Sequence, residues 1–450
     1  MTHNWPLSDH RTAEQLAQDK PAVRAQVTSL TSPNADGTAK QNADRVLERI
    51  RRRQQEAAED QATRFVSFTP ADGARPVLAA ENQLIVDATP AQLAEFGNLL
   101  AGYTAADRAG RNSRRRTRVF RARGKSTEAL LQDAKRIRDE KKVQASVNSI
   151  VPLGYVIKGN SYPGRTVAPG AFAANGGGAP VRVAIIDTGL TAVPRTDSWD
   201  TGVVRNGTDP VNVLAPMDRI DWFAGHGTFA AGIVRQIAPD CEVVVYRFTS
   251  TDGLGTDEAA ADMMIQAADD AAGGRLIINA SFGAPAVDGV PPLAMQEAAR
   301  YVNDTYPNAL IIASAGNDGL DLPHFPAAYP FPRVKAVGAL NSDLSAASFS
   351  NHGSWVDCST VGVGIVSTFV EGKLPPEVDL GTDIVFPGDS WATWSGTSFT
   401  APQISGAVAC LCGENGTLAP QAAFDQLIAG QPALAGYGKV VHLLPGTPAA

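Results

Sequence analysis

The stretch VRVAIIDTG (residues 181–189) decides the fold class of this chain. It is an apolar run without polar alternation that ends in an acidic residue and a glycine turn, which is typical of a strand buried on both faces of a parallel sheet. Further segments of this kind follow, separated by helical stretches that begin at His226, Asp257 and Pro292. These segments are CEVVVYRF (241–248), RLIINASF (275–282), ALIIASAG (309–316) and VKAVGAL (334–340). We therefore expect an α/β domain with a doubly wound, mostly parallel sheet and a ligand site at the carboxyl ends of its strands.

Composition excludes several classes of protein. The 450 residues are 44% hydrophobic and 19% charged, which suits two or three packed domains rather than a disordered chain. No apolar run reaches the roughly 18 residues of a membrane helix, so we expect no membrane partner. The N-terminal residues MTHNWPLSDH show no secretory signal. Four cysteines without a CxxC pair argue against a zinc ribbon. A cytoplasmic location is the default expectation, with unconventional export left open.

Charge divides the chain into two unequal parts. Residues 1–150 hold 25 Lys and Arg against 18 Asp and Glu, whereas the remainder holds 14 against 28, so a basic part of +7 precedes an acidic part of −14. Such a division is expected if the two parts are domains that attract each other through opposite charge. The alternative is that the basic part is a tail that binds nucleic acid. The arginine run at residues 51–53 reads as a solvated helix face, so we expect no nucleic-acid partner.

Four regions follow from the pattern along the chain. Residues 1–62 are expected to be a flexible and partly helical extension, and residues 154–179 a linker rich in Gly, Pro, Ser and Asn. Between them, residues 63–153 read as strand, helix, strand, helix, strand, which predicts a small ferredoxin-like α+β domain. Residues 180–446 form the α/β domain.

Three polar residues occupy positions suited to catalysis. Asp187 ends the strand quoted above, His226 lies between glycines at a predicted helix start, and Ser398 lies in SGTSFTAP at another helix start. Each alone has an ordinary explanation as a cap, turn or structural residue. A serine hydroxyl needs an adjacent base, and the base needs an anionic partner, so the three together predict a nucleophilic triad. Their order along the chain, Asp then His then Ser, is the subtilisin order.

Residues 181–444 resemble the subtilisin-like serine proteases. The resemblance rests on VAIIDTG, GHGTFAAGIV and SGTSFTAPQISGAVA, with INASFGA (278–284) and ASAGNDG (313–319) between them. It implies that Asp187 orients the histidine, that His226 is the general base and that Ser398 is the nucleophile. It also implies that Asn317 donates to the oxyanion. The helix-cap and turn explanations of these residues remain the alternative.

The resemblance further implies where a peptide substrate binds. Two backbone edges would pair with the peptide, and a pocket would receive the side chain that precedes the cleaved bond. If His324 lies at the base of this pocket, we expect a polar pocket that prefers small side chains. The alternative is that His324 is a surface residue of a loop. The implied residues are Gly253, Leu254 and Gly255 on one edge, Ser281, Phe282 and Gly283 on the other, and Ser314, Ala315, Gly316 and His324 in the pocket, with Asp318 nearby.

The remaining expectations concern cofactors and partners. After His226 the chain lacks the insertion that holds a tight calcium ion in subtilisins, so we expect no cofactor and no metal, with calcium left open as the alternative. The order of elements in the domain at 63–153 resembles that of the inhibitory propeptide of the same family. We therefore expect two kinds of partner: peptide or protein substrates, and the chain's own N-terminal domain as an inhibitor. The sequence thus predicts a self-inhibited serine endopeptidase. The alternatives are a catalytically silent binding module and the acidic carboxyl proteases that share an SGTS serine motif.

Overall fold

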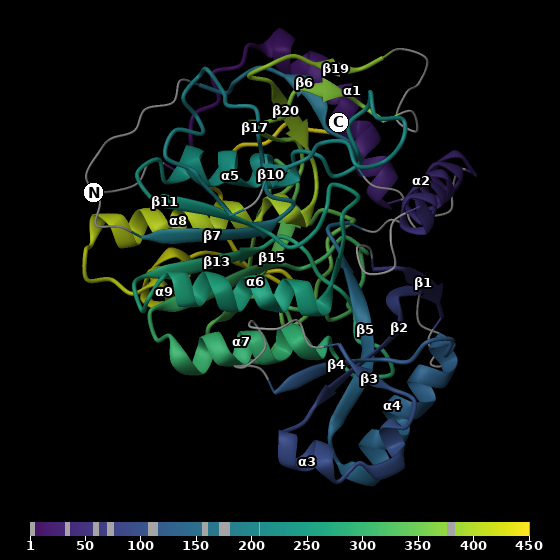
Figure 1. The fold of residues 1–450 in the computed structure, drawn as a ribbon. Coiled ribbons are helices and arrows are strands. Elements are labelled where there is room, and N and C mark those ends of the chain that lie inside the picture. The colour runs from purple at the N-terminus through teal and green to yellow at the C-terminus, as the bar shows by residue number, and fades with distance from the viewer. Residues whose placement is uncertain are drawn as a thin grey trace.

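The structure, a computed structural model, describes residues 5–31, 37–56, 63–69, 76–106, 116–154, 161–170, 181–206, 208–375 and 383–449. A nine-stranded sheet forms the centre of the larger domain (Figure 1). Its strands run in parallel except at the edge, where β21 and β22 pair antiparallel. In spatial order they are β21 (Ala433–Leu434), β22 (Gly438–Val440), β16 (Cys358–Val361), β15 (Val334–Leu340), β14 (Ala309–Ser314), β13 (Leu276–Ala280), β7 (Arg182–Asp187), β11 (Glu242–Arg247) and β9 (Val204–Asn206).

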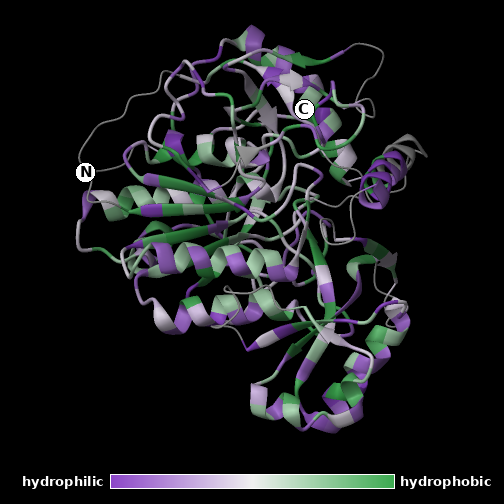
Figure 2. Ribbon diagram, in the orientation of Figure 1, coloured by the Kyte–Doolittle hydropathy of each residue, from purple (hydrophilic) through white to green (hydrophobic). Residues whose placement is uncertain are grey.

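Helices cover both faces of this sheet because its strands are apolar on both sides. In β7, Ala184 and Ile186 pack into the core under one helical layer, whereas Val183 and Ile185 pack into the core on the opposite face. The first layer holds α6 (Asp257–Asp270) and α7 (Leu293–Thr305); the second holds α5 (His226–Ile237), α8 (Ala401–Glu414) and α9 (Pro420–Ile428). Figure 2 shows the central strands as hydrophobic. The predicted doubly wound α/β fold is confirmed.

A second, antiparallel sheet belongs to the N-terminal domain. Strands β5, β2, β4 and β3 lie in that order, with β1 paired to the first residues of β2, Val77 to Ala80. Helix α4 packs on one face through Ala134 and Ile137, which contact the core that holds Leu84 and Val86 of β2. The elements are β1 (Phe65–Phe68), β2 (Val77–Asp87), α3 (Pro90–Ala94), η1 (Gly97–Leu100), β3 (Thr104–Ala105), β4 (Thr117–Arg121), α4 (Thr127–Lys141) and β5 (Gln144–Pro152).

The N-terminal domain joins the larger one through a shared strand pair. Strand β12 (Leu254–Thr256) of the larger domain pairs antiparallel with the end of β5, with Leu254 opposite Pro152 and Thr256 opposite Ile150. The carboxyl end of β5 therefore points toward the carboxyl ends of the parallel strands, where the site lies. Figure 1 shows β5 reaching from the small domain to the body of the large one.

Two helices lie in the described part of the first 62 residues, for which a flexible and partly helical extension was expected. Helix α1 (Ala13–Thr31) lies along the large domain, beside β6 (Gly164–Thr166) and β20 (Trp391–Trp394). Helix α2 (Gly37–Glu56) packs Val46, Leu47 and Ile50 into the main core, while charged residues such as Arg51 and Arg52 are exposed; Figure 2 shows this helix as mostly hydrophilic. Helix α1 was missed because its buried face contains Asp19 and Gln26, which an apolar pattern does not reveal.

Short elements complete the large domain. Strand β6 falls within the expected linker, of which residues 155–160 and 171–179 lie outside the described part. These short elements are β8 (Leu190–Thr191), β10 (Thr208–Asp209), β17 (Ile365–Thr368), β18 (Gly372–Lys373), β19 (Val385–Phe386) and η3 (Thr397–Phe399).

Candidate active site

Asp187 and His226 form a buried pair at the carboxyl edge of the sheet. Nδ1 of His226 lies 2.9 Å from Oδ1 and 2.8 Å from Oδ2 of Asp187, and both side chains are almost inaccessible to solvent. The pair can form because helix α5 approaches the strand closely: a Cβ at Gly227 would lie 2.3 Å from the carbonyl oxygen of Gly189. The carboxylate thus fixes the proton on Nδ1 and leaves Nε2 as the basic nitrogen.

Aromatic side chains surround the imidazole of His226. The rings of Phe399, Trp394 and Phe223 lie 5.3, 5.6 and 6.1 Å from it, centre to centre. They exclude water from the histidine and hold its plane. Because a low-polarity environment strengthens the attraction between unlike charges, the imidazolium that forms on proton transfer is stabilised by Asp187.

Ser398 lies in η3, one turn before helix α8. Its hydroxyl donates to the backbone carbonyl of Ser281 over 3.1 Å and lies 3.5 Å from the carbonyl oxygen of Leu153. The Ser281 hydroxyl in turn donates to the Ser398 carbonyl over 2.8 Å. No hydrogen bond between Ser398 and His226 is present in the described part of the chain. The structure therefore joins two of the three predicted residues directly and places the third against the end of β5.

Asn317 is fixed by the residue that precedes the serine. Its Oδ1 accepts from the backbone N–H of Thr397 at 2.8 Å and from the Thr397 hydroxyl at 2.9 Å. The same hydroxyl accepts from the N–H of Gly316 at 3.2 Å. These contacts occupy the amide oxygen of Asn317 and fix the side chain beside the residue that precedes Ser398.

The predicted edge at residues 253–255 is occupied by the chain itself. The N–H of Leu153 donates to the carbonyl of Gly253 over 3.0 Å, and the register continues along β12. Glycine is required at 253 because its φ is +76° and a Cβ would lie 2.1 Å from the ring of Phe223. This edge therefore binds an extended peptide through backbone hydrogen bonds.

A small cavity lies beside Ser398 and the second predicted edge. Its volume is about 30 Å³, and it is lined on the protein side by Phe282, Gly283, Ser314, Gly316, Asn317, Asp318, His324, Thr397 and Ser398, and by Pro152, Leu153 and Gly154 from β5 and its end. Ala315, which was predicted to line it, is fully buried instead and is not among the lining residues. Ser281 lies behind this wall and contacts the serine.

His324 forms part of that wall. A Cβ at Gly283 would lie 2.4 Å from His324 Nδ1, so the ring fills the space beside this glycine. Nδ1 is buried and has no hydrogen-bond partner within the described residues. Burial lowers the pKa of His324, while the negative charge of Asp318 acts in the opposite direction. The imidazole is therefore neutral near pH 7.

Asp221 supports two loops that border the site, and the sequence did not reveal it. It accepts from the hydroxyl of Thr251 at 2.6 Å and from the N–H groups of Val213 and Leu214 at 2.5 and 3.1 Å. The loop before His226 is thus tied to the turn before the 253–255 edge. Burial outweighs these hydrogen bonds and raises the pKa of Asp221 to about 6. Its sequence surroundings, RIDWFAG, show no pattern that would have singled it out.

The raised pKa of Asp221 predicts a pH-dependent stability. The unfolded carboxyl ionises near pH 4 and the folded one near pH 6, so this group favours folding at low pH and loses that contribution as pH rises from 4 to 6. The free energy of unfolding of the wild type, minus that of Asp221→Asn, should fall by about 2–3 kcal/mol over this interval. Denaturant unfolding of both proteins in a Ser398→Ala background measures it, with exposed Asp304→Asn as the control. A difference that stays level across pH 4–6 would contradict the assignment.

Two features of the described residues concern metal-ligating side chains and cysteine thiols. They contain no group of three or more His, Cys, Asp or Glu side chains arranged to hold a metal ion, and no helix among them is long and apolar enough to cross a membrane. None of the four cysteines forms a disulfide. Burial raises the pKa of Cys410 and of Cys412 to about 11, so neither supplies a thiolate nucleophile near pH 7.

Comparison with known proteins gives a consistent result. The model of the subtilase family matches residues 178–431. The "Thermophilic serine proteinase" of Bacillus sp. (strain AK1) is 31% identical over 264 residues, which are 56% of this chain and 57% of that protein. Subtilisin BL of Lederbergia lenta is 27% identical over 260 residues, 56% of this chain and 83% of the relative. The matched part thus spans little more than half the length of the first of these two proteins.

One solved structure is similar over more of the chain. Fervidolysin from Fervidobacterium pennivorans, described as a keratinolytic enzyme related to subtilisin, has a TM-score of 0.56 at 18% identity. The likeness covers 81% of this chain and 60% of that one. At this identity it concerns the fold alone, and it extends beyond the segment that the family model matches.

Proposed function

The chain belongs to the subtilase family, and from this premise we propose that it is a serine endopeptidase that is inhibited by its own N-terminal domain. The observation that carries the proposal is the position of β5: its end lies on the 253–255 edge and brings the carbonyl oxygen of Leu153 to 3.5 Å from Ser398 Oγ. This position of the chain's own peptide, beside the proposed nucleophile Ser398, supports an inhibitory role for the N-terminal domain.

Hydrolysis proceeds in two steps. When Ser398 rotates from the Ser281 carbonyl toward His226, its oxygen attacks the peptide carbonyl while Nε2 takes its proton. The imidazolium, stabilised by Asp187, then gives that proton to the leaving amine, and the carbon–nitrogen bond breaks. Water attacks the resulting ester with His226 again as base, and the acid product leaves Ser398 restored.

The negative charge that develops on the carbonyl oxygen requires a donor. Asn317 supplies its amide Nδ2, and the backbone N–H of Ser398 supplies a second donor. Asn317→Ala is expected to lower kcat by about 10²–10³ with little change in KM. Exposed Asn308→Ala is the matched control. Asn317→Asp keeps an acceptor for Thr397 but loses the donor, so full activity in that variant would show that Asn317 only supports Thr397.

The proposed inhibition is supported by contacts away from the cleft. The carboxylate of Glu297, on α7, accepts from the backbone N–H groups of Arg116 and Thr117 at the start of β4, the latter at 2.7 Å. On the other side of the cleft, Arg53 of α2 pairs with Asp252 at 2.8 Å. The first contact uses backbone N–H groups and the second is an ion pair, so only the pair of Arg53 with Asp252 reflects the opposite net charges of the two parts.

Loss of the Glu297 contact is expected to weaken the inhibition. Glu297 is only 5% exposed, and hydrogen bonds to a charged group contribute about 1.5–3 kcal/mol. Glu297→Ala should therefore speed the appearance of peptidase activity by about tenfold or more, at an unchanged final kcat. Time courses of peptide hydrolysis from freshly purified full-length chain measure this, with exposed Glu140→Ala as the control. A lag as long as that of the wild type would show that this contact does not hold the inhibitor.

The endopeptidase activity is tested with the chain's own sequence. An internally quenched peptide with blocked ends, NSIVPLGYVIK (residues 148–158), should be cut at the bond that follows Leu153 or the bond that follows Gly154. A peptide of the same composition in scrambled order is the control. If neither the fresh nor the incubated full-length chain cleaves this peptide or unfolded casein, the proposed function is wrong.

A further inference from the structure

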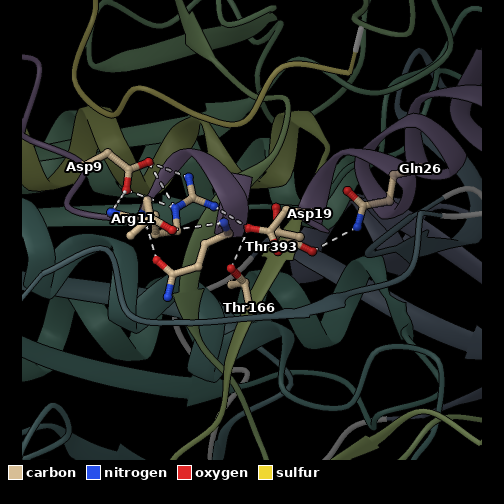
Figure 3. A network of polar contacts seen from close by, with 8 residues as sticks. Asp9, Arg11, Asp19, Gln26, Thr166 and Thr393 are labelled. Carbon is tan, nitrogen blue, oxygen red and sulfur yellow. Dashed lines mark hydrogen bonds and ion pairs between the residues drawn. The ribbon is translucent and has the colours of Figure 1, made fainter. Parts of the chain in front are cut away.

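Helix α1 carries a buried polar side chain that reaches the loop of the nucleophile. Gln26, 3% exposed, donates through Nε2 to the backbone carbonyls of Tyr162 and Thr393, over 2.6 and 2.9 Å. Its Oε1 accepts from the hydroxyl of Ser395 over 2.7 Å. All three contacts cross from the first 31 residues to segments more than 130 positions away. Figure 3 shows Gln26 and Thr393 in this network.

Ser395 begins the loop that ends at Ser398. Its hydroxyl accepts from the N–H of Gly364 at 2.9 Å, and its carbonyl accepts from the hydroxyl of Ser161 at 2.5 Å. Two residues later, Thr397 holds Asn317. A hydrogen-bonded path therefore runs from Gln26 through Ser395 to the loop that carries both the nucleophile and the fixed oxyanion donor.

Helix α1 is anchored firmly enough to act as part of the large domain. The Thr166 hydroxyl of β6 donates to Asp19 over 2.6 Å, and within the N-terminal segment the buried guanidinium of Arg11 holds Asp19 at 2.7 Å and Asp9 at 2.5 Å (Figure 3). Close packing adds to this, since a Cβ at Gly164 would lie 2.7 Å from the Cβ of Ala22. Apolar contacts of the same helix join a small core of the large domain through Val23 and Leu30.

We propose that Gln26 is a positioning residue for the Ser398 loop and that residues 5–31 remain on the large domain after the chain is cut near Leu153. This rests on the proposed peptidase function. Helix α1 precedes the cut and β6 follows it, yet the two lie packed together. The helix therefore stays by non-covalent contacts, while the inhibitory domain between them leaves the cleft. The effect is on rate because displacement of a reacting group by about 1 Å can cost about 10²-fold in turnover.

The test compares Gln26→Met with Gln18→Met, an exposed glutamine of the same helix. Methionine keeps the length of the side chain but removes all three hydrogen bonds. Gln26→Met is expected to lower kcat for the quenched peptide, and the rate of self-cleavage, by about 10–100-fold with KM within about twofold. Gln18→Met should match the wild type. Ser395→Ala should resemble Gln26→Met, and the double variant should lose little more than either one, because both remove the same contact.

Several results would overturn the inference. One is a kcat for Gln26→Met equal to that of the wild type with only the melting temperature lowered, which indicates a purely structural helix. Another is an active enzyme of wild-type kcat whose mass, after size exclusion, lacks residues 5–31. If Gln26→Met does not fold, the same kinetic measurements on Ser395→Ala and Gln26→Glu test the inference instead. Gln26→Glu keeps the acceptor for the Ser395 hydroxyl. A wild type without peptidase activity would instead defeat the proposed function itself.

Discussion

Replacement of Ser398 by alanine is expected to yield a folded chain that neither cuts itself nor hydrolyses peptides. The hydroxyl oxygen of Ser398 lies 3.1 Å from the carbonyl oxygen of Ser281 and 3.5 Å from that of Leu153, beside the peptide bond that it is proposed to attack. Loss of the serine from the subtilisin triad lowers turnover by about 10⁶-fold, so the variant's activity should fall to the background of the assay. Alanine leaves the surrounding backbone contacts unchanged, and stability should therefore differ little.

The measurement is the rate of quenched-peptide hydrolysis, followed together with the intact mass over a day. Exposed Ser348→Ala is the matched control and should behave as the wild type. Self-cleavage of the Ser398→Ala chain at the wild-type rate would mean that another group, or a contaminating protease, performs the reaction.

Asp187→Asn is expected to have the second largest effect. The carboxylate accepts the Nδ1 proton of His226, whereas an amide nitrogen at the same place would donate to Nδ1 and move the proton to Nε2. Nε2 of His226 would then already carry a proton and could not accept the one from Ser398. Such a change lowers kcat by about 10⁴-fold in a serine protease with this arrangement, while the geometry of the site is kept.

The same hydrolysis assay measures this loss, with exposed Asp218→Asn as the control for removal of one charge. KM should change little because Asp187 does not contact the peptide edge. A drop of tenfold or less would indicate that the pair is a structural contact of a buried histidine and that another residue serves as base.

Much of the large domain could be predicted from sequence. The strand at 276–280, for example, is short, mostly apolar and contains two isoleucines, and it falls between two helices, so its type and order followed from local pattern. The positions of Asp187 and His226 followed as well, because the ends of parallel strands and the starts of the next helices meet at one edge.

Other features depend on contacts that no local pattern encodes. Helix α1 buries Asp19 and Gln26 against a surface that only exists once the large domain has folded. The role of Ser281 as a direct partner of Ser398, and the burial of Ala315, depend on tertiary packing at the level of single side chains. Such positions are set by partners distant in sequence, which a pattern of hydrophobicity does not report.

The central claim is that Ser398 attacks peptide carbonyls and that the first peptide bond it cuts belongs to this chain itself. Intact-mass analysis of the wild type and Ser398→Ala, each treated with a fluorophosphonate probe, tests it most directly. We predict that the wild type is cut after residue 153 or 154 into an N-terminal and a C-terminal fragment and that the probe labels only the C-terminal one. The Ser398→Ala chain should stay whole and unlabelled. Label on both proteins, or cleavage of both at the same rate, would contradict the account.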